Sequence, residues 1–148
     1  MKKFSSILFL SILLLLMNHS VKAQAKITHI AVYVSELNRS SEFYRDVLNF
    51  KEIEEPFKDG LHAWFDIGNQ VQLHLIEAEW EPVTINKINH LCFSVPNMDD
   101  FITILRQHQV EFEDWPGEKN KITIRPDGIK QIYLRDPDGY WIEFNDEY

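Results

Sequence analysis

The sequence predicts an α+β fold built from two βαβββ modules that follow one another along the chain. The segments KITHIAVYV, which begins at Lys26, and KINHLCFSV, which begins at Lys87, share lysine, isoleucine, histidine and a final valine at matching positions. Each segment is followed by a helical pattern and then by three strand-like runs separated by turn residues. We therefore expect a single domain over residues 26–148, with modules at 26–77 and 87–148.

The first module is expected to contain a strand, a helix and three further strands. Residues 27–34 alternate and are rich in β-branched side chains, which indicates a strand. The polar residues up to Ser41 offer a helix N-cap, and apolar residues then recur at helical spacing until Asn49 closes the helix. Further strands are expected over 51–54, 62–67 and 71–76, with turns at Asp59-Gly60 and Gly68-Asn69.

The second module repeats this order. Residues 88–95 form the first strand, and Asn97 is a good cap for a helix with Asp99 and Asp100 in its first turn. The buried stripe of this helix is expected to consist of Phe101, Ile102 and Leu105. Three strands follow over 122–125, 131–135 and 140–144, separated by Pro126-Asp127-Gly128 and Asp136-Pro137-Asp138-Gly139.

Strand periodicity groups the polar residues on one side of each sheet. Residues i and i+2 of a strand share a face, so the small and polar positions should point away from the helices. These positions are His29, Ala31 and Tyr33 in the first copy, and His90, Cys92 and Ser94 in the second. On the last strand of each module, His74 shares a face with Gln72, and Glu143 shares a face with Trp141.

Each module thus offers one metal-ligand type of side chain on its first strand and one on its last. The four residues are His29, His74, His90 and Glu143. Three imidazoles and a carboxylate suit a divalent zinc, nickel, manganese, cobalt or iron ion. Their neighbours are candidates for lining a substrate pocket, and a nearby arginine is a candidate for attracting an anionic substrate. These pocket candidates are Tyr33, Gln72, Cys92, Trp141 and Arg125.

The chain resembles the vicinal oxygen chelate superfamily, which contains glyoxalase I and the bleomycin-resistance-type proteins. The resemblance covers residues 27–145 and is carried by THIAVYVSEL, SSEFYRDVLNF, NHLCFSV and DPDGYWIEF. It implies that the two modules form a cupped mixed sheet around a divalent metal ion. It further implies that the ligands lie on the first and last strands of each module, where they fall on His29, His74, His90 and Glu143.

The resemblance also implies a function. A lyase or isomerase similar to lactoylglutathione lyase would polarise vicinal oxygens of a small substrate, with Glu143 as ligand and base. His74 departs from this pattern, because glyoxalase I-like enzymes usually carry glutamate there and related epimerases carry glutamine. Two alternatives stay open: a fosfomycin-type thiol transferase, whose two histidines and one glutamate match His29, His90 and Glu143, and a non-catalytic protein that sequesters a small molecule. We expect a homodimer, with the site formed within one chain or across exchanged modules.

The N-terminal 25 residues have the layout of a secretory signal peptide. Two lysines are followed by the apolar run Ile7–Met17 and by small residues that place cleavage near Ala23 or Ala25. We therefore expect an exported protein, periplasmic or secreted, without a stable membrane anchor after cleavage.

Charge and cysteine content narrow the possible partners. Loss of the three lysines in the N-terminal segment changes the formal net charge from −8 to −11. A protein this acidic repels nucleic acid backbones, so a small-molecule substrate is expected instead. Cys92 is the single cysteine, which excludes an internal disulfide.

Overall fold

The computed structural model describes residues 24–79 and 84–148. The proposed signal peptide therefore lies almost wholly outside the described residues, as does part of the segment that joins the modules. Within the described ranges, no helix combines the length and the apolar character that crossing a membrane requires.

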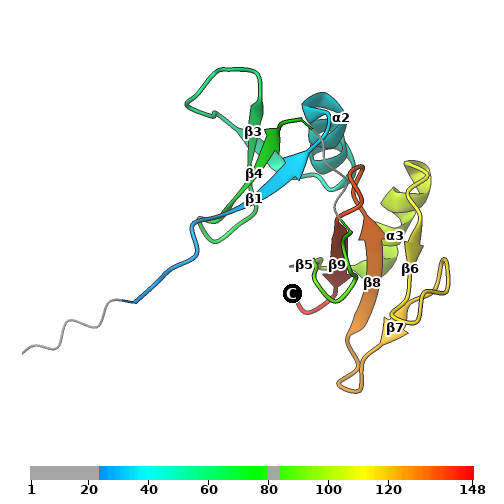
Figure 1. The fold of residues 1–148 in the computed structure, drawn as a ribbon. Coiled ribbons are helices and arrows are strands. Elements are labelled where there is room, and N and C mark those ends of the chain that lie inside the picture. The colour runs from blue at the N-terminus through cyan, green and yellow to red at the C-terminus, as the bar shows by residue number, and fades with distance from the viewer. Residues whose placement is uncertain (1–23, 80–83) are drawn as a thin grey trace, which may run out of the picture.

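Two separate sheets carry the two modules (Figure 1). Module 1 contains β1 (His29–Val34), α2 (Leu37–Glu42), a π-helical turn η1 (Phe43–Val47), β2 (Lys51–Ile53), β3 (His62–Asp66) and β4 (Gln72–Glu77). Its strand order is β1-β4-β3-β2, with β1 parallel to β4 and the other pairs antiparallel. The first strand therefore lies next to the last, which brings their side chains together on each face of the sheet.

Module 2 follows the same plan with one addition. It contains β5 (Leu91–Ser94), α3 (Met98–Gln107), β6 (Phe112–Glu113), β7 (Thr123–Ile124), β8 (Lys130–Arg135) and β9 (Trp141–Asn145). The order is β5-β9-β8-β6, and β7 also pairs with β8. The expected strand over 122–125 is thus the short β7, and β6 is a strand that the sequence did not indicate. Both elements are too short to show a periodic pattern.

The two helices start in different ways. Asn97 caps α3 as expected, because its side-chain oxygen accepts hydrogen bonds from the backbone N–H groups of Asp99 and Asp100. The expected cap near Ser41 is wrong, since α2 already begins at Leu37. There the carboxylate of Glu77, at the end of β4, accepts the Leu37 N–H at 2.6 Å and acts as a cap from a neighbouring strand.

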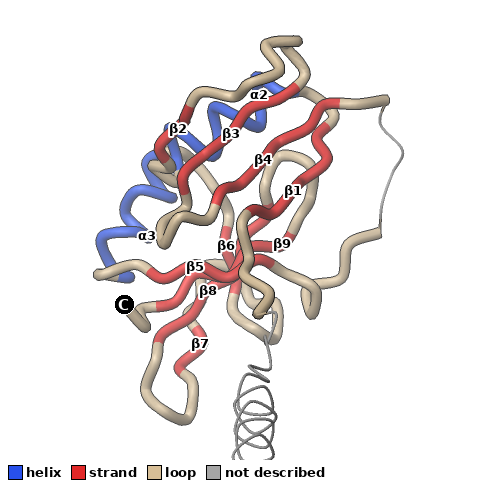
Figure 2. The backbone as a smooth tube through the Cα atoms, turned by 90° about the vertical axis from the view of Figure 1, so that its left-hand side faces the viewer, coloured by secondary structure: helices blue, strands red, loops and turns tan. Residues whose placement is uncertain are grey.

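One face of each sheet packs against the helices. Leu73, Leu75 and Phe65 of module 1 are fully buried, as are Ile132 and Ile142 of module 2. Figure 2 shows α2 and α3 on the same side of the molecule. We call the opposite side of each sheet its ligand face. The expected histidine positions lie on this face, because they alternate with the buried apolar residues.

The Asp136–Gly139 turn of module 2 is hydrogen-bonded to the helical segment of module 1. The buried Tyr44 hydroxyl donates to Asp136 Oδ2 at 2.8 Å. Asp138 accepts hydrogen bonds from the backbone N–H and hydroxyl of Ser35, from the Ser40 hydroxyl and from Arg39. These hydrogen bonds join the two modules side by side.

Candidate metal-binding site

The ligand face of module 2 brings His90 and Glu143 together. The register places Glu143 of β9 between Cys92 of β5 and Tyr133 of β8. His90 lies just before β5, and its Nε2 is 3.2 Å from Glu143 Oε2. Both side chains are mostly buried, with 21% and 10% of their surface exposed. This separation is the distance expected between two donors that share one cation.

Glu143 is held by hydrogen bonds from three neighbouring side chains. The Tyr133 hydroxyl donates to Oε2 at 2.6 Å, and Asn145 Nδ2 and Cys92 Sγ donate to Oε1 at 3.3 and 3.4 Å. Gln131 Nε2 in turn donates to the Tyr133 hydroxyl at 2.8 Å. Because these groups lie on three paired strands, the orientation of the carboxylate is fixed before anything binds.

Burial and the charge of Glu143 keep the Cys92 thiol and the Tyr133 hydroxyl protonated. Burial, followed by the carboxylate of Glu143, raises the pKa of the Cys92 thiol to about 12. The same two causes, burial first, raise the pKa of Tyr133 well above its usual range. Both groups therefore stay hydrogen-bond donors to Glu143 at neutral pH rather than nucleophiles.

The ligand face of module 1 brings His29 and His74 together in a different arrangement. Their rings stack at a centroid distance of 4.4 Å, and His74 also stacks on Trp64 at 3.9 Å. His74 Nε2 is 2.9 Å from Gln72 Oε1, and His29 Nδ1 is 3.2 Å from the Thr28 hydroxyl. Burial, then the nearby His29, lowers the pKa of His74, so its ring is neutral at pH 7. A neutral imidazole is the form that binds metal.

The four predicted ligands form two pairs rather than one cluster. Among residues 24–79 and 84–148, no three His, Cys, Asp or Glu side chains of a single chain are placed to hold one metal ion. Each pair nevertheless lies where the repeat predicts, at the junction of the first and last strands of its module. One chain therefore presents two pairs of candidate ligands on separate sheets, and we call each pair a candidate half-site.

The predicted pocket residues differ in their placement. Trp141 and Cys92 lie beside Glu143 on module 2, and Gln72 contacts His74 on module 1. The Tyr33 hydroxyl donates to the backbone carbonyl of Glu79. Arg125 is engaged elsewhere, with its guanidinium 2.5 Å from Asp127 and 3.2 Å from Glu147.

Several residues around the half-sites were not singled out in the sequence. These are Tyr133, Gln131 and Asn145 on the ligand face of module 2, together with Lys87, Arg135 and Trp64. A signal existed for Tyr133, because the Asp136–Gly139 turn sets a hairpin register in which residue 133 faces residue 143. For Lys87 and Arg135 the signal was weaker, since contact with an aromatic ring depends on side-chain packing.

Comparisons with known proteins agree with this fold. The family model "Glyoxalase/Bleomycin resistance protein/Dioxygenase superfamily" matches residues 26–144. Virulence protein STM3117 of Salmonella typhimurium is 30% identical over 125 residues, which cover 81% of this chain and 83% of that protein. The metallothiol transferase FosB of Staphylococcus epidermidis is 27% identical, with 80% of each chain covered.

A solved structure shows the same fold at lower identity. The lactoylglutathione lyase from Agrobacterium tumefaciens aligns with a TM-score of 0.64 at 20% identity, covering 85% of this chain and 96% of that one. The family model spans nearly all of the described residues, and it matches both repeats. The chain therefore belongs to the glyoxalase/bleomycin resistance protein/dioxygenase superfamily, the vicinal oxygen chelate proteins.

Proposed function

We propose that this protein is a divalent-metal-dependent lyase or isomerase of the glyoxalase type. We further propose that its metal is held between module 1 of one chain and module 2 of a second copy. The observation that carries the proposal is the division of three imidazoles and one carboxylate into two half-sites. His29 and His74 would come from one chain, and His90 and Glu143 from the other. Such a donor set suits a first-row transition metal ion.

The hydrogen bonding of His90 supports a cation at the module 2 half-site. Its Nδ1 lies 2.8 Å from the carbonyl oxygen of Lys87, so Nδ1 must carry a proton and donate it. In the neutral ring, Nε2 then has a lone pair that faces the Glu143 carboxylate at 3.2 Å. Two acceptors at this distance repel one another unless a cation, either a proton or a metal ion, lies between them.

Exposed groups around the half-sites support pairing with a second copy. Ile27 and Ile88 occupy the same position in the two repeats, two residues before His29 and His90, and they are 58% and 74% exposed. The Trp64 indole N–H is buried and has no acceptor among the described residues. An isologous dimer would cover these isoleucines.

The chain's own residues would then divide the chemistry as follows. A divalent ion bound at this site would polarise adjacent oxygens of a substrate and acidify the neighbouring C–H bond. Glu143 would accept the proton, because it is the carboxylate of the donor set. The Tyr133 hydroxyl would hold Glu143 Oε2 in place, and the protonated Cys92 would not compete as a nucleophile.

A thiol transferase is the second candidate, and the position of His74 favours it. This ring is sandwiched between Trp64 and His29 and is bonded to Gln72, so it is the least available of the four donors. The remaining His29, His90 and Glu143 form a two-histidine, one-glutamate set. If the metal is held by three ligands, as in a thiol transferase, the His74→Gln variant should keep its full metal content. If all four residues are ligands, the same variant should lose most of its metal.

Mixed dimers test the proposed assembly directly. A His29→Ala/His74→Ala chain and a His90→Ala/Glu143→Gln chain should each bind no metal alone. Co-expressed, they should regain about a quarter of the wild-type metal content, because half of randomly paired dimers would each contain one intact site. Elemental analysis after chelator-free purification measures this. If the wild type binds one equivalent of metal per chain and the mixture binds none, the site lies within one chain. If the wild type stays metal-free after reconstitution, the proposal itself is overturned.

We also infer that the mature protein is exported. The support is the apolar N-terminal run Ile7–Met17 with small residues near Ala23 and Ala25. A mature chain beginning at Gln24 or Lys26 in the extracytoplasmic fraction is the expected outcome, and an intact N-terminus in the cytoplasm would contradict it.

A further inference from the structure

One guanidinium group near the module 2 half-site has no counter-charge. Arg39, Arg45 and Arg125 all form ion pairs with acidic side chains. Arg135 forms none with any residue in 24–79 or 84–148. Its guanidinium carbon instead lies 4.2 Å from the ring centroid of Trp141, which is only 7% exposed. The buried indole thus contacts an exposed and unpaired guanidinium group.

The strand register puts this cation on the same face as Glu143. Arg135 pairs with Trp141, and Tyr133 pairs with Glu143, so the two pairs form consecutive rows of the ligand face. Two residues along a strand span about 7 Å, which is the expected spacing between the row of Arg135 and the row of Glu143. A small substrate can bridge that distance.

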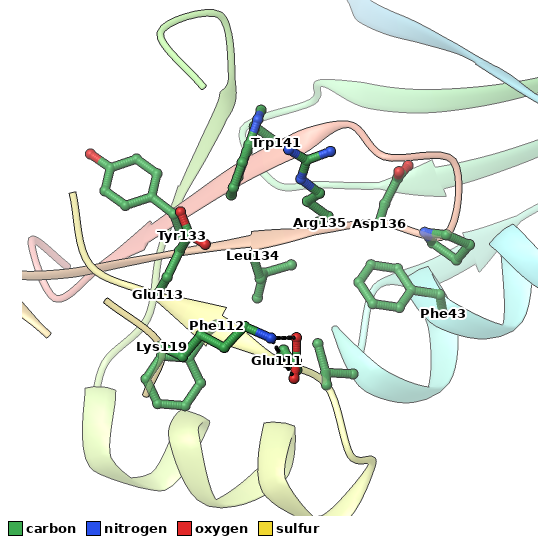
Figure 3. Close-up of a pocket in the computed structure, with 12 residues that line it drawn as sticks. Phe43, Glu111, Phe112, Glu113, Lys119, Tyr133, Leu134, Arg135, Asp136 and Trp141 are labelled. Atoms are coloured by element: carbon green, nitrogen blue, oxygen red, sulfur yellow. Dashed lines mark hydrogen bonds and ion pairs between the residues drawn. The ribbon is translucent and has the colours of Figure 1, made fainter. Parts of the chain in front are cut away.

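A pocket opens beside Arg135 because β6 is so short. The strand pairs with β8 only at Phe112–Leu134 and Glu113–Tyr133, so Arg135 lies beyond the last pair. The pocket there has a volume of about 350 Å³, and its apolar walls include Phe43, Phe112, Leu134 and Trp141. In Figure 3, Arg135 and Trp141 lie side by side at one end of this pocket.

The other charged side chains of the pocket already have partners. Lys119 lies 2.7 Å from Glu111 at the far end, as the dashed line in Figure 3 marks. Glu113 is paired with Lys87, whose ammonium group also lies over the Trp141 ring at 4.8 Å. Asp136 accepts hydrogen bonds from the Tyr44 hydroxyl and from two backbone N–H groups. Arg135 is therefore the one cation of the pocket without an acidic partner among the described residues, whereas the Asp136 carboxylate already accepts three hydrogen bonds.

We propose that Arg135 and Trp141 form an anion subsite that binds the carboxylate of a small organic acid, with the apolar or aromatic body of the acid in the adjoining pocket. The inference deepens the proposed function by assigning its substrate to the class of small carboxylic acids. It rests on that function only for the position of the reacting oxygens, which would lie beside Glu143. A planar guanidinium binds a carboxylate through two parallel hydrogen bonds, so lysine would be a poor substitute.

Binding of phenylacetate to the metal-free full-length mature protein tests the subsite without the metal. Calorimetry or ligand-observed NMR should detect binding of phenylacetate. Its neutral analogue phenylacetamide should bind at least about tenfold more weakly. Arg135→Gln should abolish the preference for the acid, and Arg135→Lys should restore only part of it. Arg106→Gln is the matched control, because this arginine also has no ion pair in the described chain but lies in the last turn of α3; it should bind phenylacetate like wild type.

The outcomes separate this inference from the proposed function. Equal binding of acid and amide, no binding of either, or wild-type binding by Arg135→Gln would overturn the subsite. Arg135→Gln should keep the wild-type metal content, since Arg135 contacts none of the four ligands. A wild-type protein that binds phenylacetate through Arg135 but no metal would retain the subsite and refute the metal-dependent function. A wild-type protein that binds metal but does not prefer the acid would retain the metal-dependent function and refute the subsite.

Discussion

The two modules share a topology but differ in the chemistry of their ligand faces. In module 2, Glu143 and His90 belong to a network of hydrogen bonds that includes Tyr133 and Asn145, and the whole of β9 is buried. In module 1, the exposed His29 stacks on His74, and no carboxylate takes part. The same strand order therefore supports a rigid half-site in one module and, in the other, an adjustable half-site whose His29 ring is exposed.

In the proposed site, this difference would divide the work between the two modules. A carboxylate that acts as a base needs fixed orientation, and the hydrogen bonds around Glu143 provide it. His29 is exposed, so its ring can adjust to a metal more readily than His74, which is held between His29 and Trp64. We expect substitutions in module 2 to have the larger effect on metal binding.

The largest expected effect follows from removing the charge of Glu143. Glu143→Gln should lower bound metal to less than about a tenth of the wild-type content, because the only carboxylate of the donor set is lost. Elemental analysis of the purified protein measures the change. Glu147→Gln is a suitable control, since Glu147 is exposed and pairs only with Arg125. If Glu143→Gln kept its metal, the assignment of module 2 as the rigid half-site would be wrong.

The equivalent turns of the two modules should differ in their contribution to stability. Asp138 has only 1% of its side chain exposed and accepts hydrogen bonds from Ser35, Ser40 and Arg39 across the module junction. Asp138→Ala leaves these donors unpaired and should lower the free energy of unfolding by about 2–4 kcal/mol. Asp66 accepts only the Gly68 N–H within its own exposed turn, so Asp66→Ala should cost less than about 1 kcal/mol. Urea denaturation compares the two, and equal losses would show that the junction contributes little.

A smaller effect is expected from the groups that orient the ligands. Tyr133→Phe removes the donor at 2.6 Å from Glu143 and should weaken metal affinity about tenfold. Thr28→Val removes the hydroxyl at 3.2 Å from the exposed His29 and should change the affinity by less than about threefold. Competition with a chelating dye measures both affinities. A larger loss in Thr28→Val would reverse the proposed contrast between a rigid and an adjustable half-site.

Local signals in the sequence were sufficient for the strands that carry the ligands. Alternation along Ile27–Val34 and the Asn97 cap of α3 both depend on residues close in sequence, and both were predicted correctly. The start of α2 was not, because its cap is supplied by Glu77 of β4 and its serines serve the module junction. Such contacts depend on the packed fold, and no local pattern encodes them.

The candidate site could be predicted only in part for the same reason. The repeat indicated His29, His74, His90 and Glu143, and the structure pairs them module by module. That the pairs stay apart within one chain follows from how the Asp136–Gly139 turn packs against Ser35, Ser40 and Tyr44. Periodicity does not specify the packing of one module against another, so the sequence left both arrangements open.

A pH dependence of stability is also expected from the module junction. Burial raises the pKa of Asp136 to about 6 from a usual value of 3.8, although the hydrogen bond from Tyr44 opposes the rise. The folded state therefore binds more protons than the unfolded state between these two values, so stability should fall as the pH rises from about 4 to about 6. Burial also disfavours ionisation of Asp138, but hydrogen bonds from Ser35 and Ser40 lower its pKa. Its contribution changes only below about pH 4, outside this range.

Paired substitutions assign this dependence to one module. Asp136→Asn keeps an oxygen that can accept the backbone N–H groups of Asp138 and Tyr140, but it cannot ionise. Its free energy of unfolding should lack the decline between pH 4 and 6 that the wild type shows, when both are measured by urea denaturation. Asp66→Asn changes the equivalent exposed turn of module 1 and should keep the wild-type slope. A slope that persists in Asp136→Asn would mean that another group, and not Asp136, causes the pH dependence.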